Sequence, residues 1–237
     1  MTAAAGPEAV PSDGGPLVFV ADLDAPVLAD DDRHHLGRVR RLRAGDAIVL
    51  ADGVGRWRPA RFTAADPEPT GAVTREPVAA PPVGVAFALV KGGRPELAVQ
   101  KLTELGVDHL HPFVAARSVV RWDQARAESG HARLARVARE AAMQSRRATV
   151  PTVHPVASFA DVAALPGACR ADRGGAPVTL EHPVVLVGPE GGWDERERLA
   201  DLPVVGLGTG VLRAETAAIA AGVVLASLRA GLVAPAP

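Results

Sequence analysis

Residues 184–215, VVLVGPEGGWDERERLADLPVVGLGTGVLRAE, are the stretch that decides the fold of this chain. They contain an apolar run, a Gly/Pro-rich loop, a short polar segment, a second apolar run and a second glycine-rich loop. Short apolar runs bounded by glycine loops are typical of buried parallel strands. Open α/β sheets bind ligands at the carboxyl ends of such strands. The stretch therefore predicts a parallel α/β sheet with a ligand site made by two loops.

The two loops do not carry the usual signatures for nucleotide phosphates. Neither fits the phosphate loop G-x-x-x-x-G-K-[ST]. Gly206, Gly208 and Gly210 approach the dinucleotide pattern G-x-G-x-x-G, but Val211 occupies the place of its third glycine. A dinucleotide-dependent oxidoreductase that uses GLGTG is therefore the weakest of the functional hypotheses.

Strands and helices alternate through the rest of the second half, as in a parallel α/β sheet. The apolar run 83–90 predicts a buried strand, and residues 109–114 predict another. A helix is expected from Pro95 to a cap at Gly106, with Leu97, Leu102 and Leu105 on its packed face. The longest helix is expected over 123–144 and a last one over about 214–230, whereas residues 150–180 show no clear pattern.

The first half predicts a small β-rich domain followed by a linker at 79–82. Strands are expected at 17–20, 47–50, 56–63 and 73–78, with a hairpin turn at Asp52-Gly53. Residues 34–43 predict a short helix or turn that packs through Leu36, Val39 and Leu42. Residues 1–15 have no signal-peptide pattern, and their small, Pro/Gly-rich composition predicts disorder.

Charge and cysteine content narrow the functional classes. The net charge is −1, yet residues 33–61 carry a local net charge of +6 and residues 117–147 one of +5. Two basic patches fit a nucleic-acid footprint, and a solvated arginine-rich surface is an equal alternative. The single cysteine, Cys169, excludes a disulfide framework and a multi-cysteine zinc site, and the histidines have no metal-ligand spacing. We expect a cytoplasmic protein without a metal or a membrane span.

Four segments of the second half, taken in order, resemble one family: KGGRPELAVQKLTELGV (91–107), EAAMQSRRATVP (140–151), LVGPEGGWDERE (186–197) and LGTGVLRAETA (207–217). The segments HHLGRVRRLRAGD (34–46) and DGVGR (52–56) match the amino-terminal domain of the same family. This is the RsmE family, whose members methylate a uridine at N3 in small-subunit (16S) ribosomal RNA with S-adenosylmethionine. The resemblance extends from about residue 17 to the last helix.

The resemblance implies a fold and a set of partners. The fold would be α/β, with a PUA-like β-barrel followed by a SPOUT parallel-sheet methyltransferase domain whose carboxyl-terminal end forms a trefoil knot. The corresponding boundaries are 1–15 for the disordered extension, 16–80 for the RNA-binding barrel and 81–237 for the methyltransferase domain. The implied cofactor is S-adenosylmethionine. The implied partners are small-subunit ribosomal RNA, free or in the assembled subunit, and a second copy of the chain in a homodimer.

The family motifs also assign residues to the site. The cofactor would be held mostly by backbone groups of the two loops, which fits a ligand that has no phosphate. These positions are Val187, Gly188, Pro189, Glu190, Gly191, Gly192, Leu207, Gly208, Leu212, Arg213 and Thr216. RNA contacts would come from Arg38, Arg40, Arg41, Arg94, Gln144, Arg146 and Arg147. With no tyrosine in the chain, base stacking would depend on phenylalanine or tryptophan, with Trp57, Trp122 and Trp193 as candidates.

The reaction itself suggests roles for two residues. A uridine N3–H is a poor nucleophile, so the site needs a proton acceptor and a cation that stabilises the uracil anion. Arg213 is the candidate cation, with an ion pair to Glu215 or a bond to a carbonyl as the structural alternative. Glu215 is the candidate acceptor, and the alternative makes it a first-turn residue favoured by the helix dipole. Glu190 is expected to order its own loop or an interface.

Three positions depart from the family pattern, and two other functions remain open. The family often has an acidic residue at Gly93, a glutamate at Met143 and an arginine at Gly210. A knotted methyltransferase that acts on another RNA position would share the same loops. A non-catalytic RNA-binding or ribosome-assembly protein would use the first domain and the basic helix alone.

Overall fold

The structure is a computed structural model that describes residues 8–63, 65–91, 94–120 and 122–234. The chain divides into two compact units, which are described separately below. Unit 1 comprises Met1–Val78 and Arg139–Val150, and unit 2 comprises Ala79–Ala138 and Pro151–Pro237. Unit 1 therefore includes a segment, 139–150, that lies within the range expected for the second domain. No helix in the described part of the chain is long and apolar enough to cross a membrane.

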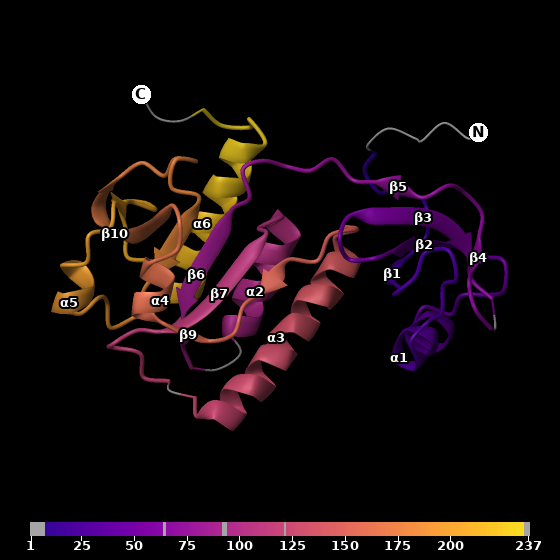
Figure 1. Ribbon diagram of the computed structural model, residues 1–237, viewed down its shortest axis with the longest axis horizontal. Helices are drawn as coiled ribbons and strands as arrows, with labels where there is room; N and C mark the ends of the chain where they lie inside the picture. The colour runs from indigo at the N-terminus through magenta and orange to yellow at the C-terminus, as the bar shows by residue number, and fades with distance from the viewer. Residues whose placement is uncertain (1–7, 64, 92–93, 121, 235–237) are drawn as a thin grey trace. The chain divides into compact units, whose positions relative to one another are not determined.

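Unit 1 is built on a five-stranded sheet in the order β1-β2-β3-β4, with β5 also paired to β3 (Figure 1). Its strands are β1 (Leu17–Phe19), β2 (Ala47–Ala51), β3 (Arg56–Arg61), β4 (Glu68–Pro69) and β5 (Thr74–Arg75). β1 runs parallel to β2, and β2 is antiparallel to β3 across the predicted hairpin. Asp52 stabilises the turn, because its Oδ1 accepts the backbone N–H groups of Val54 at 2.9 Å and Arg56 at 3.0 Å.

The helical segment of unit 1 differs from a regular helix. It consists of α1 (Asp30–His34) followed by a π-helix, η1 (His35–Val39). Leu36 is buried and Leu42 packs against the same core cluster, but Val39 is 62% exposed, so its predicted burial is wrong. The i→i+5 bonds of a π-helix rotate successive residues by less than an α-helix does, which turns Val39 off the packed face. Arg41 then ends the segment in the left-handed region, at φ 57°.

Residues 8–15 are ordered against unit 1, contrary to the disorder expected over 1–15; residues 1–7 lie outside the described part. The N–H of Glu8 donates to the carbonyl of Arg75 at 2.9 Å, and Trp57 Nε1 donates to the carbonyl of Glu8 at 2.9 Å. Arg146 donates to the carbonyls of Pro11 and Gly15. Composition did not reveal these bonds, because their partners lie up to 135 residues away along the chain.

Unit 2 is an α/β unit with a seven-stranded parallel sheet in the order β12-β10-β11-β6-β7-β8, with β9 also paired to β7. The strands are β6 (Gly84–Ala88), β7 (His109–Val114), β8 (Thr152–Val153), β9 (Ala157–Ser158), β10 (Ala168–Ala176), β11 (Val184–Val187) and β12 (Val204–Val205). The expected fold class, a parallel α/β sheet preceded by a small β-rich unit, is confirmed.

Strand β10 is the longest of the elements within residues 150–180 that the sequence did not reveal. Its sequence, ACRADRGGA, is polar and glycine-rich, so it has little of the apolar pattern of a buried strand. The strand holds its place because Arg170 is buried and donates to the carbonyls of Glu197 at 2.6 Å and Arg198 at 2.9 Å. Cys169 also lies in β10, where burial raises the pKa of its thiol to about 12 and makes it a poor nucleophile.

Helices cover both faces of the unit 2 sheet (Figure 1). The helices within unit 2 are α2 (Arg94–Leu105), α4 (Phe159–Ala163), α5 (Glu195–Arg198) and α6 (Ala214–Arg229), while α3 (Gln124–Gln144) belongs to unit 2 up to residue 138 and to unit 1 beyond it. α2 packs on α6, and both contact the central strands, while α4 contacts β7 and β10. Gly106 caps α2 at φ 87°, as predicted, and Leu102 is fully buried. Leu97 is 41% exposed, so its predicted place on the packed face is wrong.

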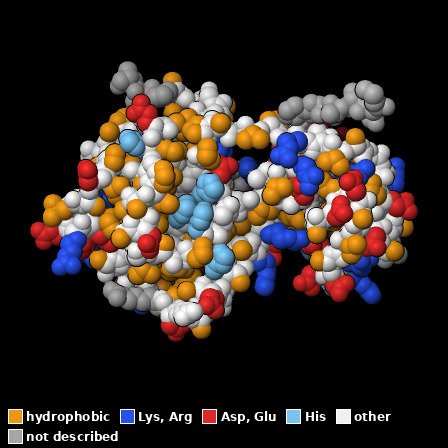
Figure 2. All heavy atoms as spheres, in the orientation of Figure 1, with side chains coloured by type: hydrophobic (Ala, Val, Ile, Leu, Met, Phe, Trp, Pro, Cys, Tyr) orange, Lys and Arg blue, Asp and Glu red, His pale blue; other side chains and the backbone are white. Residues whose placement is uncertain are grey.

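Three histidines come together in unit 2, although their sequence positions showed no cluster. The rings of His111 and His154 stack at 4.0 Å between centroids, and His154 Nε2 lies 3.3 Å from His109 Nδ1. Histidine side chains gather on one face of the molecule in Figure 2. No group of residues suited to hold a metal ion occurs in the described part of the chain. Burial is the main cause that lowers the pKa of His111 to about 4, and the two neighbouring imidazoles contribute.

We expect His111 to make the folded state lose stability as the pH falls. Its pKa is about 4 when folded and about 6.5 when unfolded, so only the unfolded chain takes up the proton between these values. The loss begins below about pH 6.5 and reaches up to about 3 kcal/mol near pH 4. Urea unfolding of the wild-type chain and of His111→Asn at pH 7.5 and 4.5 measures it. Equal pH dependence in the two proteins would contradict the assignment.

Candidate active site

The candidate site lies at the carboxyl ends of three parallel strands of unit 2, because a loop follows β6, β11 and β12 at that edge. The order of the sheet separates β11 from β12 by β10 and places β6 on the other side of β11. The loop after β11 covers 188–194, and the loop after β12 covers 206–213. These are the two glycine loops that the sequence predicted as a ligand site.

The loop after β11 is packed against its own protein for most of its length. A Cβ on Gly188 would lie 2.9 Å from the buried ring of Trp193, so this glycine makes room for the indole. The N–H of Gly192 donates to the carbonyl of Pro189 at 2.8 Å, and Gly192 has a φ of 68°. Arg117 donates to the carbonyl of Gly191 at 3.1 Å. Val187 and Pro189 are buried, so they can meet a ligand only through backbone groups.

The loop after β12 is open along its length. The N–H of Gly206 donates to the carbonyl of Ala176 at 2.8 Å, which fixes the start of the loop to β10. Gly208 has a φ of 149°, and a Cβ on Gly208 or Gly210 would meet nothing within 4 Å. Leu207 is half-buried and Leu212 is 38% exposed. This loop therefore offers accessible backbone groups and apolar surface, which is what a bound cofactor requires.

Arg94 connects the loop after β11 to the start of α6, which follows the loop after β12. It is the first residue of α2, and its guanidinium forms an ion pair with Glu190 in the loop after β11. Its Nε also lies 3.7 Å from Oε1 of Glu215 in the first turn of α6. This ion pair would let Glu190 order its own loop, one of the two roles expected for it. The site residues Arg94, Glu190 and Glu215 lie together, although Arg94 was expected only as an RNA contact.

Glu215 keeps one oxygen unsatisfied. Its side chain is 11% exposed, and its Oε2 is buried without a hydrogen-bond partner in the described part of the chain. A buried acceptor without a donor costs about 1–3 kcal/mol, so such an atom points to a missing donor or to a chemical role. Its pair with Arg94 also decides against the alternative in which Glu215 pairs with Arg213.

Arg213 is free to act on a ligand. It is the N-cap residue of α6, with extended backbone angles and no capping bond from its side chain. Its guanidinium is exposed and forms no hydrogen bond or ion pair with any residue that the structure describes. Thr216, one turn further, is also exposed. Arg213 is thus an unpaired cation, among the described residues, at the end of the loop after β12.

The other predicted RNA contacts lie in unit 1 and divide into two kinds. Arg38, Arg40, Arg41 and Gln144 are exposed. Arg146 is half-buried, and its guanidinium already donates hydrogen bonds to backbone carbonyls of the N-terminal segment. Burial lowers the pKa of Arg146, and Asp13 offsets part of that effect. Arg147 is half-buried as well. A direct phosphate contact therefore fits Arg38, Arg40 and Arg41 better than Arg146.

Two of the three tryptophans are unavailable for base stacking. Trp57 is 5% exposed, and Trp193 is 3% exposed and stacks on Phe113 at 6.2 Å. Trp122 is half-exposed and packs against Gly130. Of the family departures, Met143 lies in unit 1 and Gly210 in the open loop, while Gly93 lies outside the described residues.

Two residues that order the site were missed from the sequence. Arg117 binds Gly191, which is 74 residues away along the chain. Glu197 caps α5 through Asp194 and also accepts the N–H of Ala116 at 2.7 Å. The capping-box pattern of Asp194 and Glu197 is visible in the sequence. No local sequence pattern predicts the hydrogen bond between Glu197 and Ala116.

Comparison with known proteins identifies the class. Residues 78–226 match the model of an RNA methyltransferase domain, and residues 28–69 match that of an RNA methyltransferase PUA domain. The fold and the loop site therefore define a two-domain RNA methyltransferase.

Similar proteins identify the particular family. The chain is 38% identical to ribosomal RNA small subunit methyltransferase E of Mycobacterium bovis, over 84% of this chain and 86% of the relative. It is 32% identical to the Bacillus subtilis protein of the same name, over 80% and 85%. A crystal structure of the Neisseria gonorrhoeae protein of that name, bound to S-adenosyl methionine, matches with a TM-score of 0.79 and 28% identity over 91% of this chain and 97% of the other. The chain belongs to the ribosomal RNA small subunit methyltransferase E family.

We expect Arg94→Met to loosen the loop after β11, because Glu190 then loses its cation. Hydrogen–deuterium exchange of peptides that cover 188–194 should speed up by about threefold to tenfold, the effect of an ion pair worth about 1 kcal/mol. Arg133→Met, which breaks the ion pair with Glu96 in the same unit, is the matched control and should leave this loop unchanged. Equal exchange in both variants would show that Arg94 does not order the loop.

Proposed function

We propose that the protein transfers a methyl group from S-adenosylmethionine to N3 of a uridine in small-subunit (16S) ribosomal RNA. The observation that carries the proposal is the site at the sheet edge. Within the described residues, three features are adjacent in the chain: an open glycine loop, an unpaired Arg213 and a Glu215 oxygen without a donor. Arg94 of α2 contacts Glu215. Membership in the ribosomal RNA small subunit methyltransferase E family supports the same reaction.

The residues of the two loops fit the proposed cofactor. The Neisseria gonorrhoeae relative is described as bound to S-adenosyl methionine. That molecule has no phosphate, which agrees with loops that lack both phosphate signatures. Backbone groups at 187–192 and 207–208 would hold it, with Leu212 and Thr216 beside them. When bound, S-adenosylmethionine supplies an electrophilic methyl group on a sulfonium.

The chain's own residues would prepare the uridine. N3 must lose its proton to become a nucleophile, and the negative charge then spreads over the two carbonyl oxygens that flank N3. The guanidinium of Arg213 would stabilise that charge at short range. The unsatisfied Oε2 of Glu215 is the proposed proton acceptor, because it is the buried oxygen nearest in sequence to Arg213 that has no donor of its own.

The proposal also includes features that follow from the family. They are a trefoil knot at the carboxyl-terminal end, a homodimer, a cytoplasmic location and a substrate that is either free RNA or the assembled small subunit. The domain boundaries 16–80 and 81–237 are part of it, with 139–150 grouped in unit 1.

The test of the function has two arms. Calorimetry should show binding of S-adenosylmethionine to the full chain. Mass-spectrometric mapping of ribosomal RNA from cells that lack the protein should show one missing N3-methyluridine in the small subunit. If the cofactor does not bind, the protein is a non-catalytic RNA-binding protein. If the missing methyl group lies at another position, the methyltransferase acts on a different nucleotide.

We expect Arg213→Ala to lower turnover by about 10²–10³-fold, the usual effect of removing one charge-stabilising donor. The affinity for S-adenosylmethionine should change much less, because the loop backbone holds the cofactor. Single-turnover methylation and calorimetry measure the two quantities, and Arg213→Lys should recover part of the rate. A parallel loss of rate and cofactor affinity would assign Arg213 to cofactor binding instead.

A further inference from the structure

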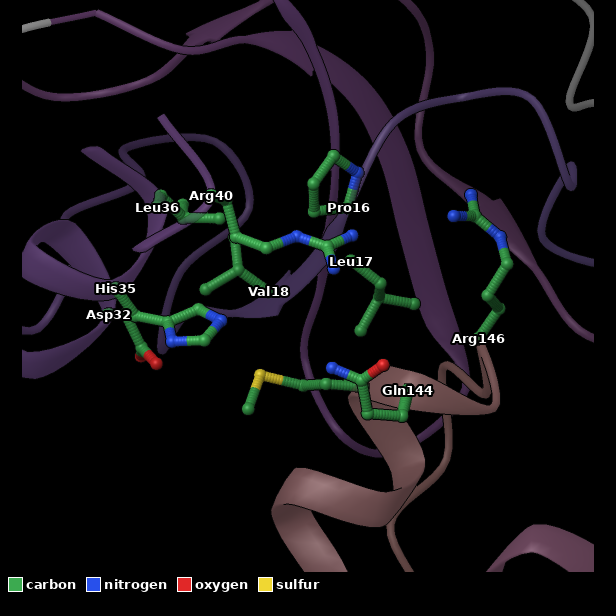
Figure 3. Close-up of a pocket in the computed structure, with 10 residues that line it drawn as sticks. Pro16, Leu17, Val18, Asp32, His35, Leu36, Arg40, Gln144 and Arg146 are labelled. Carbon is green, nitrogen blue, oxygen red and sulfur yellow. The ribbon is translucent and has the colours of Figure 1, made fainter. Parts of the chain in front are cut away.

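Unit 1 contains a pocket of about 250 Å³ that shares no residue with the loop site. It is lined by β1, the α1–η1 segment and the end of α3: Pro16, Leu17, Val18, Asp32, His35, Leu36, Arg40, Met143, Gln144 and Arg146 (Figure 3). Pockets for drug-sized molecules measure roughly 300–1,000 Å³. The space therefore admits a small planar ring rather than a larger ligand.

One wall of the pocket is formed by Pro16 and β1, and it includes the backbone edge of the strand. Three consecutive residues, Pro16, Leu17 and Val18, line the pocket, although successive side chains of a strand point to opposite faces. The Leu17 and Val18 side chains are buried in two different core clusters. Since these side chains cannot all face the pocket, the main chain forms part of this wall together with the Leu17 side chain (Figure 3). β1 is the edge strand of its sheet, so one side of that main chain has no neighbouring strand.

The backbone groups of Leu17 are the ones directed to the open edge. In a parallel pair, alternate residues of a strand bond to its neighbour. The carbonyl of Pro16 accepts from Val49 at 2.9 Å, and the N–H of Val20 donates to Ala51 at 2.9 Å. The N–H and C=O of Leu17 therefore point away from β2, and within the described part of the chain they form no hydrogen bond. The carbonyl of Phe19, next on the same edge, accepts from Arg139 of α3 at 3.4 Å.

Two polar side chains, the neutral amide of Gln144 and the guanidinium of Arg40, line the pocket beside this backbone edge. Gln144 and Arg40 reach it from two different elements, the end of α3 and the residue after η1 (Figure 3). Neither side chain is engaged by another residue that the structure describes. The carboxylate of Asp32 is already neutralised by Arg139, at 2.6 and 3.2 Å. The remaining charge in the pocket is positive, and Leu36 and Met143 supply apolar surface.

We propose that this pocket holds one unpaired nucleobase of the RNA substrate. A base edge carries an adjacent donor and acceptor, which match the N–H and C=O of Leu17 and the amide of Gln144. The apolar surface of Leu36 and Met143 suits the face of a ring. Arg40 at the rim then contacts the phosphate of the same nucleotide. The inference rests on the proposed function, because it assumes that the protein binds RNA.

The pocket predicts a specific effect of Gln144→Leu, which keeps the side-chain size and removes the hydrogen-bonding groups. RNA affinity should fall roughly tenfold, as for a lost base contact, with an unchanged slope of affinity against salt. The KM for RNA should rise by a similar factor, with kcat preserved. Gln124→Leu, at the exposed other end of α3, is the matched control and should change neither value. Arg40→Ala should weaken binding and also reduce the salt slope by about one.

Ultraviolet cross-linking of the wild-type chain to a fragment of small-subunit ribosomal RNA tests the location directly. Mass spectrometry should find nucleotide adducts in peptides that contain residues 32–40 or 143–146. The pocket proposal is wrong if the adducts in unit 1 all lie outside these peptides. It is also wrong if Gln144→Leu and Gln124→Leu bind RNA with equal affinity. Either result leaves the proposed function intact if the wild-type chain methylates RNA. If the wild-type chain forms these adducts but does not methylate RNA, the proposed function is wrong and the proposed base pocket still stands.

Discussion

Strand β10 separates β11 from β12, and the arrangement of the site depends on this insertion. The glycine loops that follow β11 and β12 lie close together in sequence, but the sheet places a whole strand between their starting points. Arg170 supports the insertion, because its buried guanidinium donates through Nη1 to the carbonyls of Glu197 and Arg198 and so ties β10 to the segment that links the two loops. The loop after β12 is then fixed at its start and open beyond it.

The glycines of the two loops have different structural roles. Gly188 leaves space for Trp193, and Gly191 and Gly192 shape a turn, so the first loop is a rigid support. Gly208 and Gly210 have no neighbours at the place of a side chain, so the second loop offers bare backbone. A rigid support beside an accessible loop is what holds a ligand in one orientation, because the protein pays little ordering cost when the ligand binds. Arg94 joins the first loop, through Glu190, to the first turn of α6, through Glu215.

Unit 1 shows how a short segment from the middle of the chain completes a domain formed by its beginning. Residues 139–150 bring Arg139 to Asp32 and Arg146 to the carbonyls of Pro11 and Gly15. These bonds use two arginines that charge counting alone would assign to nucleic acid. The remaining cations, among them Arg38, Arg40 and Arg41, are the exposed ones.

The sequence by itself determined the class of fold, the hairpin at Asp52-Gly53, the main helices and the family, because each depends on local patterns or on spaced motifs. It also singled out Arg213 and the two loops. Only the tertiary structure decided the place of β10, the π-helix that exposes Val39, and the partners of Arg94, Arg117 and Arg146. The physical reason is the separation of the partners along the chain, because these bonds join residues about 70 to 135 positions apart. Others depend on buried polar groups, and no local sequence pattern reveals which partner such a group will bond to.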